Sequence, residues 1–231
     1  MVSKIAVIGA NGKVATQLIK KLANLKTEFE PIAFIRNSSQ GSKFDDLGVK
    51  YSTDIDLVNS NLSKITESLK GFDAVIFSAG AGGKGLDNTF AVDLDGAVRV
   101  SEAVKLAKVK RFILVSAIKS QDRDFWWDNS LRSYYIAKKY ADEIISRDDD
   151  LNWTIFQPGY LTDDEGKGKV EDPTKVNGIA DKIDEKNVKI SIPRQDVAQA
   201  IIESLRDEST IKKFIPLVEG QFDIKDAFKK L

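Results

Sequence analysis

Short apolar runs alternate along this chain with longer amphipathic stretches, and this alternation constrains the fold more than any other feature. Each run is apolar at successive positions, which is typical of strands buried on both faces in a parallel sheet. Between the runs, apolar residues such as Val14, Leu18 and Leu22 recur at helical spacing. Repeated βα units predict an α/β fold, a doubly wound parallel sheet. The predicted strands are residues 5–8, 32–35, 74–77, 112–115 and 153–156, with a weaker one at 49–52.

Length and composition predict one domain. The chain has 231 residues and is 42% hydrophobic, which suits one sizeable core and not two. After residue 158 the pattern loosens into a charged, glycine-containing stretch. Shorter elements follow at 189–192, 196–205 and 214–218. We therefore expect a single domain over residues 1–231, in which 159–231 contribute a small substrate-side cap.

The charge balance and the absence of two residue types narrow the function. The 35 basic and 35 acidic residues cancel, so no net field attracts nucleic acid or an anionic membrane. No apolar run approaches the ~20 residues that span a bilayer, and we expect a cytoplasmic protein with a small-molecule partner. The chain has no Cys and no His, so we predict no metal site and no imidazole base. Monomer and homodimer both stay open.

A glycine-containing turn joins the first predicted strand to the first predicted helix. Gly9 allows the tight turn, Gly12 lets the backbone approach a pyrophosphate, and the small Ala15 permits close helix packing. The N–H groups at the helix start favour phosphates. Glycine also ends strands for purely structural reasons, so the order of strand, turn and helix is what favours dinucleotide binding. The predicted contacts are Gly9, Asn11, Gly12, Lys13 and Val14.

The end of the second strand favours NADP(H) over NAD. An acid there would bond the ribose 2′-hydroxyl and repel a 2′-phosphate. Here the strand leads into Arg36, Asn37 and Ser38, with Lys43 nearby, and a guanidinium fork suits a phosphate. The alternative is an ordinary exposed arginine at a strand end.

Two further segments are expected at the carboxyl edge of the sheet. Asp56 and Leu57 follow the third strand and are predicted to place backbone beside the adenine. Ser78, Ala79 and Gly80 end the fourth strand, where such sheets bind ligands. The structural alternative for Gly80 is a simple turn glycine.

A tyrosine and a lysine lie one turn apart in a predicted helix from about 131 to 146. Tyr134 and Lys138 share a stripe that is otherwise apolar, so Lys138 is directed inward and needs a partner or a function. Tyr135 shares the opposite side with Lys139 and Asp142, which indicates a solvated surface. The alternative for Lys138 is that its long side chain reaches past the stripe to water.

These motifs, with Ser116 at the end of the fifth strand, resemble the signature of short-chain dehydrogenases/reductases, which have a Rossmann-like fold. The closer likeness is to the atypical subgroup, which includes NAD(P)H-binding proteins similar to flavin/biliverdin reductases and to NmrA-like regulators. Ala15 replaces a glycine, and Gln157 stands where the subgroup usually has arginine. The segments that carry this closer likeness are 110–112, 134–142, 153–162 and 194–198.

The resemblance implies hydride transfer from NADPH to a small carbonyl, quinone or flavin-like acceptor. Tyr134 would donate the proton, Lys138 would lower the tyrosine pKa and bond the nicotinamide ribose, and Ser116 would bond the acceptor oxygen. Pro158 and Gly159 would pass beside the nicotinamide.

Three questions stay open at this point. Trp126 and Trp127 either wall an acceptor pocket or serve packing. A non-catalytic NADP(H)-sensing regulator would share the cofactor motifs but would not need Tyr134, Lys138 and Ser116 together. A sugar-nucleotide epimerase is disfavoured, because such relatives usually carry a larger C-terminal domain.

Overall fold

A seven-stranded parallel sheet forms the centre of the computed structural model, which describes residues 2–180 and 190–231. The strand order is β10-β6-β5-β4-β1-β2-β3, which confirms the predicted doubly wound, Rossmann-like fold. The order reverses between β1 and β4, and at such a point the connecting loops diverge and leave a crevice. The strands are β1 (Ser3–Ile8), β2 (Phe29–Phe34), β3 (Lys50–Ser52), β4 (Ala74–Phe77), β5 (Arg111–Val115), β6 (Trp153–Pro158) and β10 (Lys213–Leu217).

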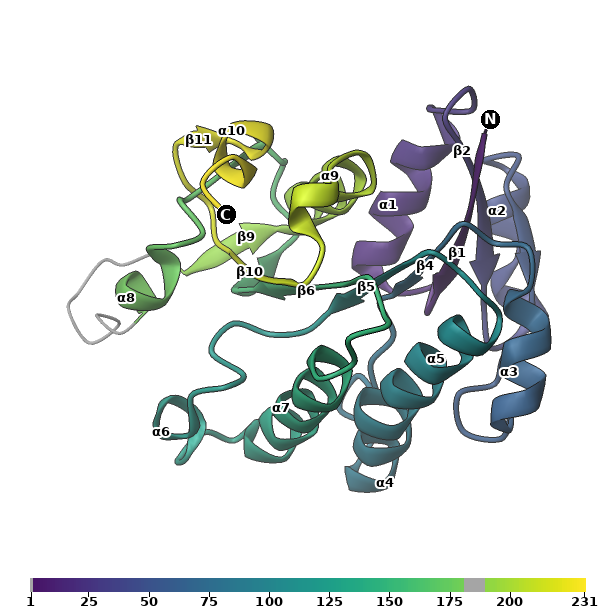
Figure 1. Ribbon diagram of the computed structural model, residues 1–231, viewed down its shortest axis with the longest axis horizontal. Helices are drawn as coiled ribbons and strands as arrows, with labels where there is room; N and C mark the ends of the chain where they lie inside the picture. The colour runs from purple at the N-terminus through teal and green to yellow at the C-terminus, as the bar shows by residue number, and fades with distance from the viewer. Residues whose placement is uncertain (1, 181–189) are drawn as a thin grey trace.

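Helices cover both faces of this sheet (Figure 1). One face carries α1 (Lys13–Ala23) and α9 (Arg194–Arg206), and the other carries α3 (Leu62–Leu69), α5 (Asp95–Leu106) and α7 (Arg132–Ser146). Along β1, Ile5 and Val7 join the core under α1 and α9, while Ala6 and Ile8 join the opposite core. Burial on both faces explains why the strand runs are apolar at every position.

Short elements fill the connections. The most unusual is η2 (Thr89–Leu94), a π-helical segment directly before α5, since π-turns are rare and often mark functional sites. No helix among the described residues is long and apolar enough to cross a membrane. The remaining short helices are η1 (Ser38–Gln40), α2 (Ser42–Asp45), α4 (Leu86–Asn88), α6 (Arg123–Trp126), α8 (Val176–Ala180), η3 (Glu208–Thr210) and α10 (Ile224–Phe228).

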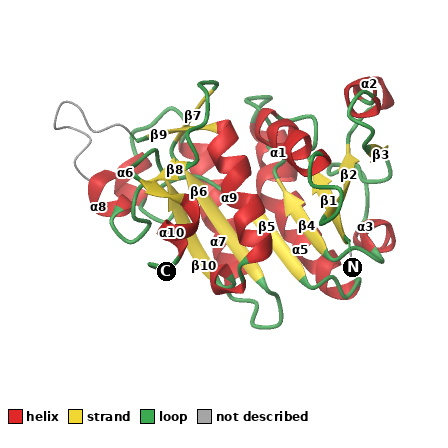
Figure 2. Cartoon of the chain, turned by 90° about the horizontal axis from the view of Figure 1, so that it is seen from above, coloured by secondary structure: helices red, strands yellow, loops and turns green. Residues whose placement is uncertain are grey.

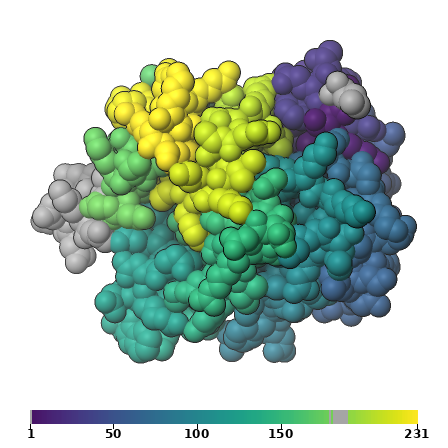
Figure 3. Space-filling model, in the orientation of Figure 1, coloured from purple at the N-terminus to yellow at the C-terminus, as the bar shows by residue number. Residues whose placement is uncertain are grey.

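The C-terminal part divides between the main layers and a small addition. β10 pairs with β6, and α9 packs on α1, so both belong to the central sandwich (Figure 2). The addition outside it consists of α8, α10 and two small sheets, β7 (Tyr160–Thr162) with β9 (Ser191–Pro193) and β8 (Lys169–Val170) with β11 (Phe222–Asp223). In the space-filling view its last residues, in yellow, lie directly against the yellow-green surface of α9 (Figure 3).

This division makes the cap smaller than the predicted 159–231. The physical reason is that the buried apolar residues of α9 and β10 belong to the core of the main sandwich. Part of the predicted cap, residues 181–189, lies outside the described residues.

Candidate functional site

A cleft of about 320 Å³ lies at the carboxyl ends of β1, β2 and β4, where the strand order reverses. Its size is within the range of small-molecule and cofactor sites. Nine of the residues predicted to contact a cofactor line it, namely Gly9, Asn11, Gly12, Arg36, Asp56, Leu57, Ser78, Ala79 and Gly80. The others lie outside this lining: Lys13 and Val14 in the first turn of α1, Asn37 and Ser38 at η1, Lys138 in α7, and Pro158 and Gly159 at the end of β6.

The glycine turn packs closely against the end of β4. Gly9 has a φ of +77°, and a Cβ added there would lie 2.6 Å from the Ala79 Cα, so only glycine fits without displacement. No side chain of the described chain caps α1, and its first turn holds no acidic residue. The free N–H groups of that first turn therefore offer a site whose chemistry fits the phosphates of a dinucleotide.

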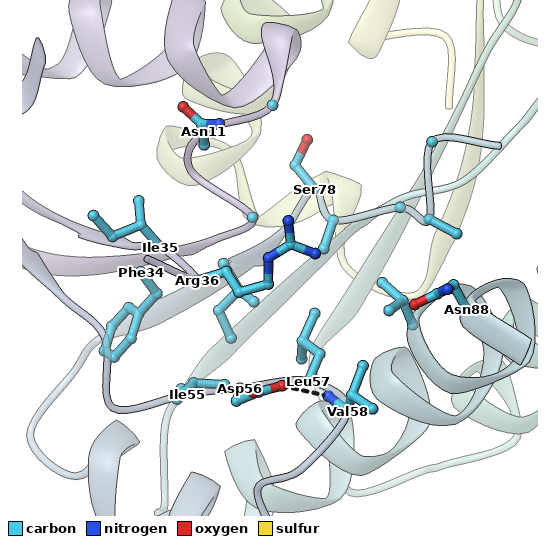
Figure 4. A pocket seen from close by; sticks show the side chains of 18 of the residues that line it. Asn11, Phe34, Ile35, Arg36, Ile55, Asp56, Leu57, Val58, Ser78 and Asn88 are labelled. Carbon is cyan, nitrogen blue, oxygen red and sulfur yellow. Dashed lines mark hydrogen bonds between the residues drawn. The ribbon is translucent and has the colours of Figure 1, made fainter. Parts of the chain in front are cut away.

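Arg36 extends into the cleft, between Asn11 on one side and the Asp56–Val58 segment on the other (Figure 4). The nearby Asp56 carboxylate accepts hydrogen bonds from the backbone N–H groups of Val58 at 2.9 Å and Asn59 at 3.2 Å. The Asn59 side-chain bond and, less strongly, the charge of Arg36 lower the pKa of Asp56. Asp56 is thus committed to its own turn, and the exposed Arg36 keeps its donor groups for a ligand.

Two lysines flank the glycine turn in different ways. The Lys43 Nζ donates to the Thr16 hydroxyl at 3.0 Å and to the Asn11 carbonyl at 3.4 Å. Burial, and then the charge of Lys20, lower the pKa of Lys43. Lys13 points elsewhere, because its ammonium pairs with Asp163 at 2.7 Å. Lys43 is therefore the cation that lies against the turn.

Lys138 is buried, with 3% of its surface exposed, so it does not reach past the apolar stripe to water. Its ammonium donates to the Val115 carbonyl at 3.3 Å and lies 3.3 Å from the Asp93 Oδ1. The other carboxylate oxygen of Asp93 accepts from the Ala81 N–H at 2.9 Å, and Ala81 lines the cleft. Asp93 thus connects the lysine to the cleft wall.

Asp93 was not among the predicted site residues. It lies in η2, where the extra residue of a π-turn shifts the register, so ordinary helical periodicity does not place it inside. The only available signal was a carboxylate next to apolar residues in an amphipathic stretch, which is common on solvated helices.

Tyr134 is half-buried, and its ring centre lies 5.5 Å from the Lys138 ammonium. Burial raises the pKa of Tyr134, while the charge of Lys138 acts to lower it. For Lys138, burial alone would lower the pKa, but Tyr134, Asp93 and Asp142 outweigh burial and raise it. The pair therefore combines a protonated phenol with a lasting positive charge.

Ser116 faces a buried carboxylate. Its hydroxyl donates to the Asp142 Oδ2 at 2.8 Å, and Ser120 donates to the same oxygen at 2.8 Å. The Gln157 amide donates to Ser120 at 2.9 Å and to Asp142 at 3.3 Å. Burial raises the pKa of Asp142 to about 6 against these hydrogen bonds and the charge of Lys138. Gln157 therefore places a neutral donor beside Asp142.

The side of α7 that carries Tyr135 and Asp142 is buried, and the prediction of a solvated surface there was wrong. Tyr135 is 4% exposed and stacks on Trp126 with ring centres 6.1 Å apart, and Asp142 is fully buried. The reason is that the segment after β5 folds over this side of the helix and brings Ser120 and Trp126 onto it. On the predicted apolar stripe, in contrast, Ile144 is 48% exposed.

The two neighbouring tryptophans differ in burial. Trp126 is fully buried and donates its indole N–H to the Ser120 carbonyl at 3.2 Å, so it serves packing. Trp127 is exposed, with the Arg132 guanidinium 3.7 Å from its ring centre.

The structure thus places the predicted site residues in two neighbouring groups. The glycine turn, Arg36 and the end of β4 line the cleft, whereas Ser116, Tyr134 and Lys138 lie outside its lining. The link between them is Asp93, which bonds the cleft wall with one oxygen and pairs with Lys138 through the other.

Comparison with known proteins identifies relatives across nearly the whole chain. Residues 9–208 match the profile of a family described as NAD(P)H-binding. The UPF0659 protein YMR090W of Saccharomyces cerevisiae is 46% identical over 99% of this chain and 98% of its own length. The "Uncharacterized sugar epimerase YhfK" of Bacillus subtilis is 36% identical over 99% of this chain and 100% of its own. The oxidoreductase ylbE of Lactococcus lactis has a similar structure, with a TM-score of 0.80, 33% identity and coverage of 99% of this chain and 96% of its own.

Proposed function

Because the chain belongs to the NAD(P)H-binding family, we propose that it is an NADPH-dependent oxidoreductase acting on a small carbonyl, quinone or flavin-like acceptor. The observation that carries this proposal is the buried Lys138, held by Asp93 beside Tyr134 and joined through Asp93 to the cleft wall. Burying a lysine with a carboxylate is costly, and such perturbed pairs concentrate at functional sites.

The cleft residues would hold the cofactor in a defined orientation. The first turn of α1 would bind the pyrophosphate through backbone N–H groups, since Gly9 and Gly12 leave room for it. Arg36 would bind the 2′-phosphate, which is the basis for proposing NADPH rather than NADH. The rest of the cofactor would run along Ser78 to Gly80 toward Asp93 and Lys138. The bound cofactor supplies the hydride.

Tyr134 would supply the proton that accompanies the hydride. Hydride transfer to a carbonyl or quinone leaves negative charge on the acceptor oxygen, and a phenol beside an ammonium is suited to neutralise it. Lys138 favours the phenolate that forms, because its positive charge lies 5.5 Å from the Tyr134 ring centre.

One observation favours a second candidate, a non-catalytic NADP(H)-sensing regulator. Ser116, Tyr134 and Lys138 lie outside the cleft lining, so the cleft could bind a cofactor without engaging them. The two candidates differ in whether NADPH is consumed, and that difference is measurable.

The deciding experiment combines binding and turnover. The protein is titrated with NADPH, NADP and NAD, and NADPH oxidation is then followed against simple carbonyls, quinones and flavins. Tyr134→Phe should bind NADPH within twofold of the native protein while kcat falls about 100-fold or more, because a general acid contributes about 10²–10⁴ in rate.

The matched control is Tyr135→Phe, which removes a hydroxyl from the adjacent residue of the same helix. Tyr135 stacks on Trp126, with the ring centres 6.1 Å apart, so kcat should change less than threefold. Binding without NADPH oxidation, unaffected by Tyr134→Phe, would establish the sensor instead. Interconversion of nucleotide-sugars without net NADPH consumption would establish an epimerase.

A further inference from the structure

The carboxylate of Asp142 has an uneven set of hydrogen bonds. Its donors among the described residues meet at Oδ2, whereas Oδ1 is buried without a hydrogen-bond partner in the described part of the chain. The two shortest bonds, both 2.8 Å, come from Ser116 and Ser120, which both lie in the loop after β5. The Asp142 Oδ2 therefore accepts hydrogen bonds from two serine hydroxyls at once.

Proton counting then limits what Ser116 can do. A serine hydroxyl has one proton and two lone pairs. An ionised Asp142 has no proton of its own, so in the 2.8 Å contact the proton must come from Ser116. While that bond is made, Ser116 has only lone pairs left for a ligand.

Burial raises the pKa of Asp142 to about 6, against the lowering effects of its hydrogen bonds and of Lys138, so this carboxyl titrates below neutral pH. The charged and titratable groups facing it are Lys138 and Tyr134 on its own helix, with Asp93 of η2 acting through Lys138. From the described part of β6 and the loop after β5, the donors to this carboxylate are uncharged: Ser116, Ser120, Gln121 and Gln157. Protonation would remove the charge that holds the hydroxyl proton of Ser116.

Resting on the proposed function, we propose that Asp142 is a positioning residue that commits the proton of Ser116 to itself, so that Ser116 acts as a hydrogen-bond acceptor at neutral pH. Tyr134 is then the hydroxyl donor to the acceptor oxygen. Below the pKa of Asp142 the neutral carboxyl holds the Ser116 proton less strongly, and the hydroxyl becomes able to donate. No covalent bond is made or broken in this exchange.

The first test needs no turnover. Carbon-13 NMR of aspartate-labelled protein follows the Asp142 carboxyl through pH 4–8, with the resonance assigned by its loss in Asp142→Asn or, if that does not fold, Asp142→Ser. Removing a hydroxyl that donates to the carboxylate should raise its midpoint by about half a unit or more in Ser116→Ala. Ser120→Ala is the positive control, since it removes the other 2.8 Å bond to the same oxygen. An unshifted midpoint in Ser116→Ala, with a shift in Ser120→Ala, would overturn the proposal.

The second test measures where the proton goes during turnover. The ratio of native to Ser116→Ala kcat should be about tenfold larger at pH 5 than at pH 8, because Ser116 donates only when Asp142 is neutral. In the Asp142→Asn background the ratio should not change with pH. A ratio independent of pH in the native background would overturn the proposal even if the NMR midpoint shifts. Absence of any NADPH oxidation would count against the reductase function alone, and the NMR midpoint would still decide whether Ser116 donates to Asp142.

Discussion

At the scale of single residues, the side chains around the cleft differ in their partners. Some pair with other groups of the protein, and one extends into the cleft. Asp56 and Lys13 are engaged within the protein, by the Val58 turn and by Asp163. Arg36 extends into the cleft. Under the proposed function, its guanidinium would bind the 2′-phosphate, and discrimination between NADP and NAD would depend on this one residue.

We expect Arg36→Ala to weaken NADPH binding about 10- to 100-fold, because a hydrogen bond to a charged group contributes about 1.5–3 kcal/mol. NADH lacks the 2′-phosphate, so its affinity should change less than threefold. Calorimetric titration of both cofactors checks this. Arg147→Ala, an exposed arginine at the end of α7, serves as the control and should alter neither affinity. Equal weakening of NADPH and NADH would remove the assignment of Arg36 to the phosphate.

At the scale of elements, the buried side chain of Arg111 links β5 to β6, α9 and η3 at the edge of the sheet opposite the cleft. The Arg111 guanidinium donates to the hydroxyls of Thr154 at 2.6 Å, Ser204 at 3.1 Å and Thr210 at 2.8 Å. Burial lowers its pKa to about 10, against the charges of Glu208 and Asp207. Three separate elements thus converge on one side chain of β5.

Arg111→Met should lower the free energy of unfolding by at least about 2 kcal/mol, because three buried hydroxyls lose a charged donor while the apolar part of the side chain is kept. Cofactor affinity should stay within threefold, since the network lies at the amino ends of the strands. Urea unfolding and NADPH titration of the same preparation check both points. A stable variant with impaired binding would show that Arg111 acts on the cleft instead.

At the scale of the whole molecule, the buried cluster around Lys138 links folding stability to pH. Asp142 has a pKa of about 6 in the folded protein against an ordinary value of 3.8. Between these values the folded chain holds a proton that the unfolded chain has lost, so the contribution of Asp142 to stability falls as the pH rises.

We therefore expect the unfolding free energy of the native protein, relative to Asp142→Asn, to decrease by about 2 kcal/mol between pH 4 and pH 7.5, taking about 1.4 kcal/mol per pKa unit. Urea denaturation of both proteins across this range measures it. A difference that stays constant or grows with pH would mean that Asp142 is not the buried acid described here.

The fold and the cleft could be predicted from the sequence, because both depend on local patterns. Strands apolar on both faces define the sheet, and the order of strand, glycine turn and helix around Gly9 places the cleft. The Asp142 cluster could not be predicted, because it depends on the loop after β5, which folds over the side of α7 that carries Tyr135 and Asp142. Asp93 was missed because a π-turn breaks helical periodicity. The element at 214–218 was predicted, but its place in the main sheet was not, because the pairing of β10 with β6 is long-range.

The central claim is that one cofactor spans the cleft and the Tyr134–Lys138 pair. A crystal structure of the NADPH complex measures this most directly. We predict the pyrophosphate against the first turn of α1 and the nicotinamide ribose within hydrogen-bond distance of the Lys138 ammonium. A cofactor whose adenosine half occupies the cleft while its nicotinamide half leads away from Asp93 and Lys138 would contradict the account.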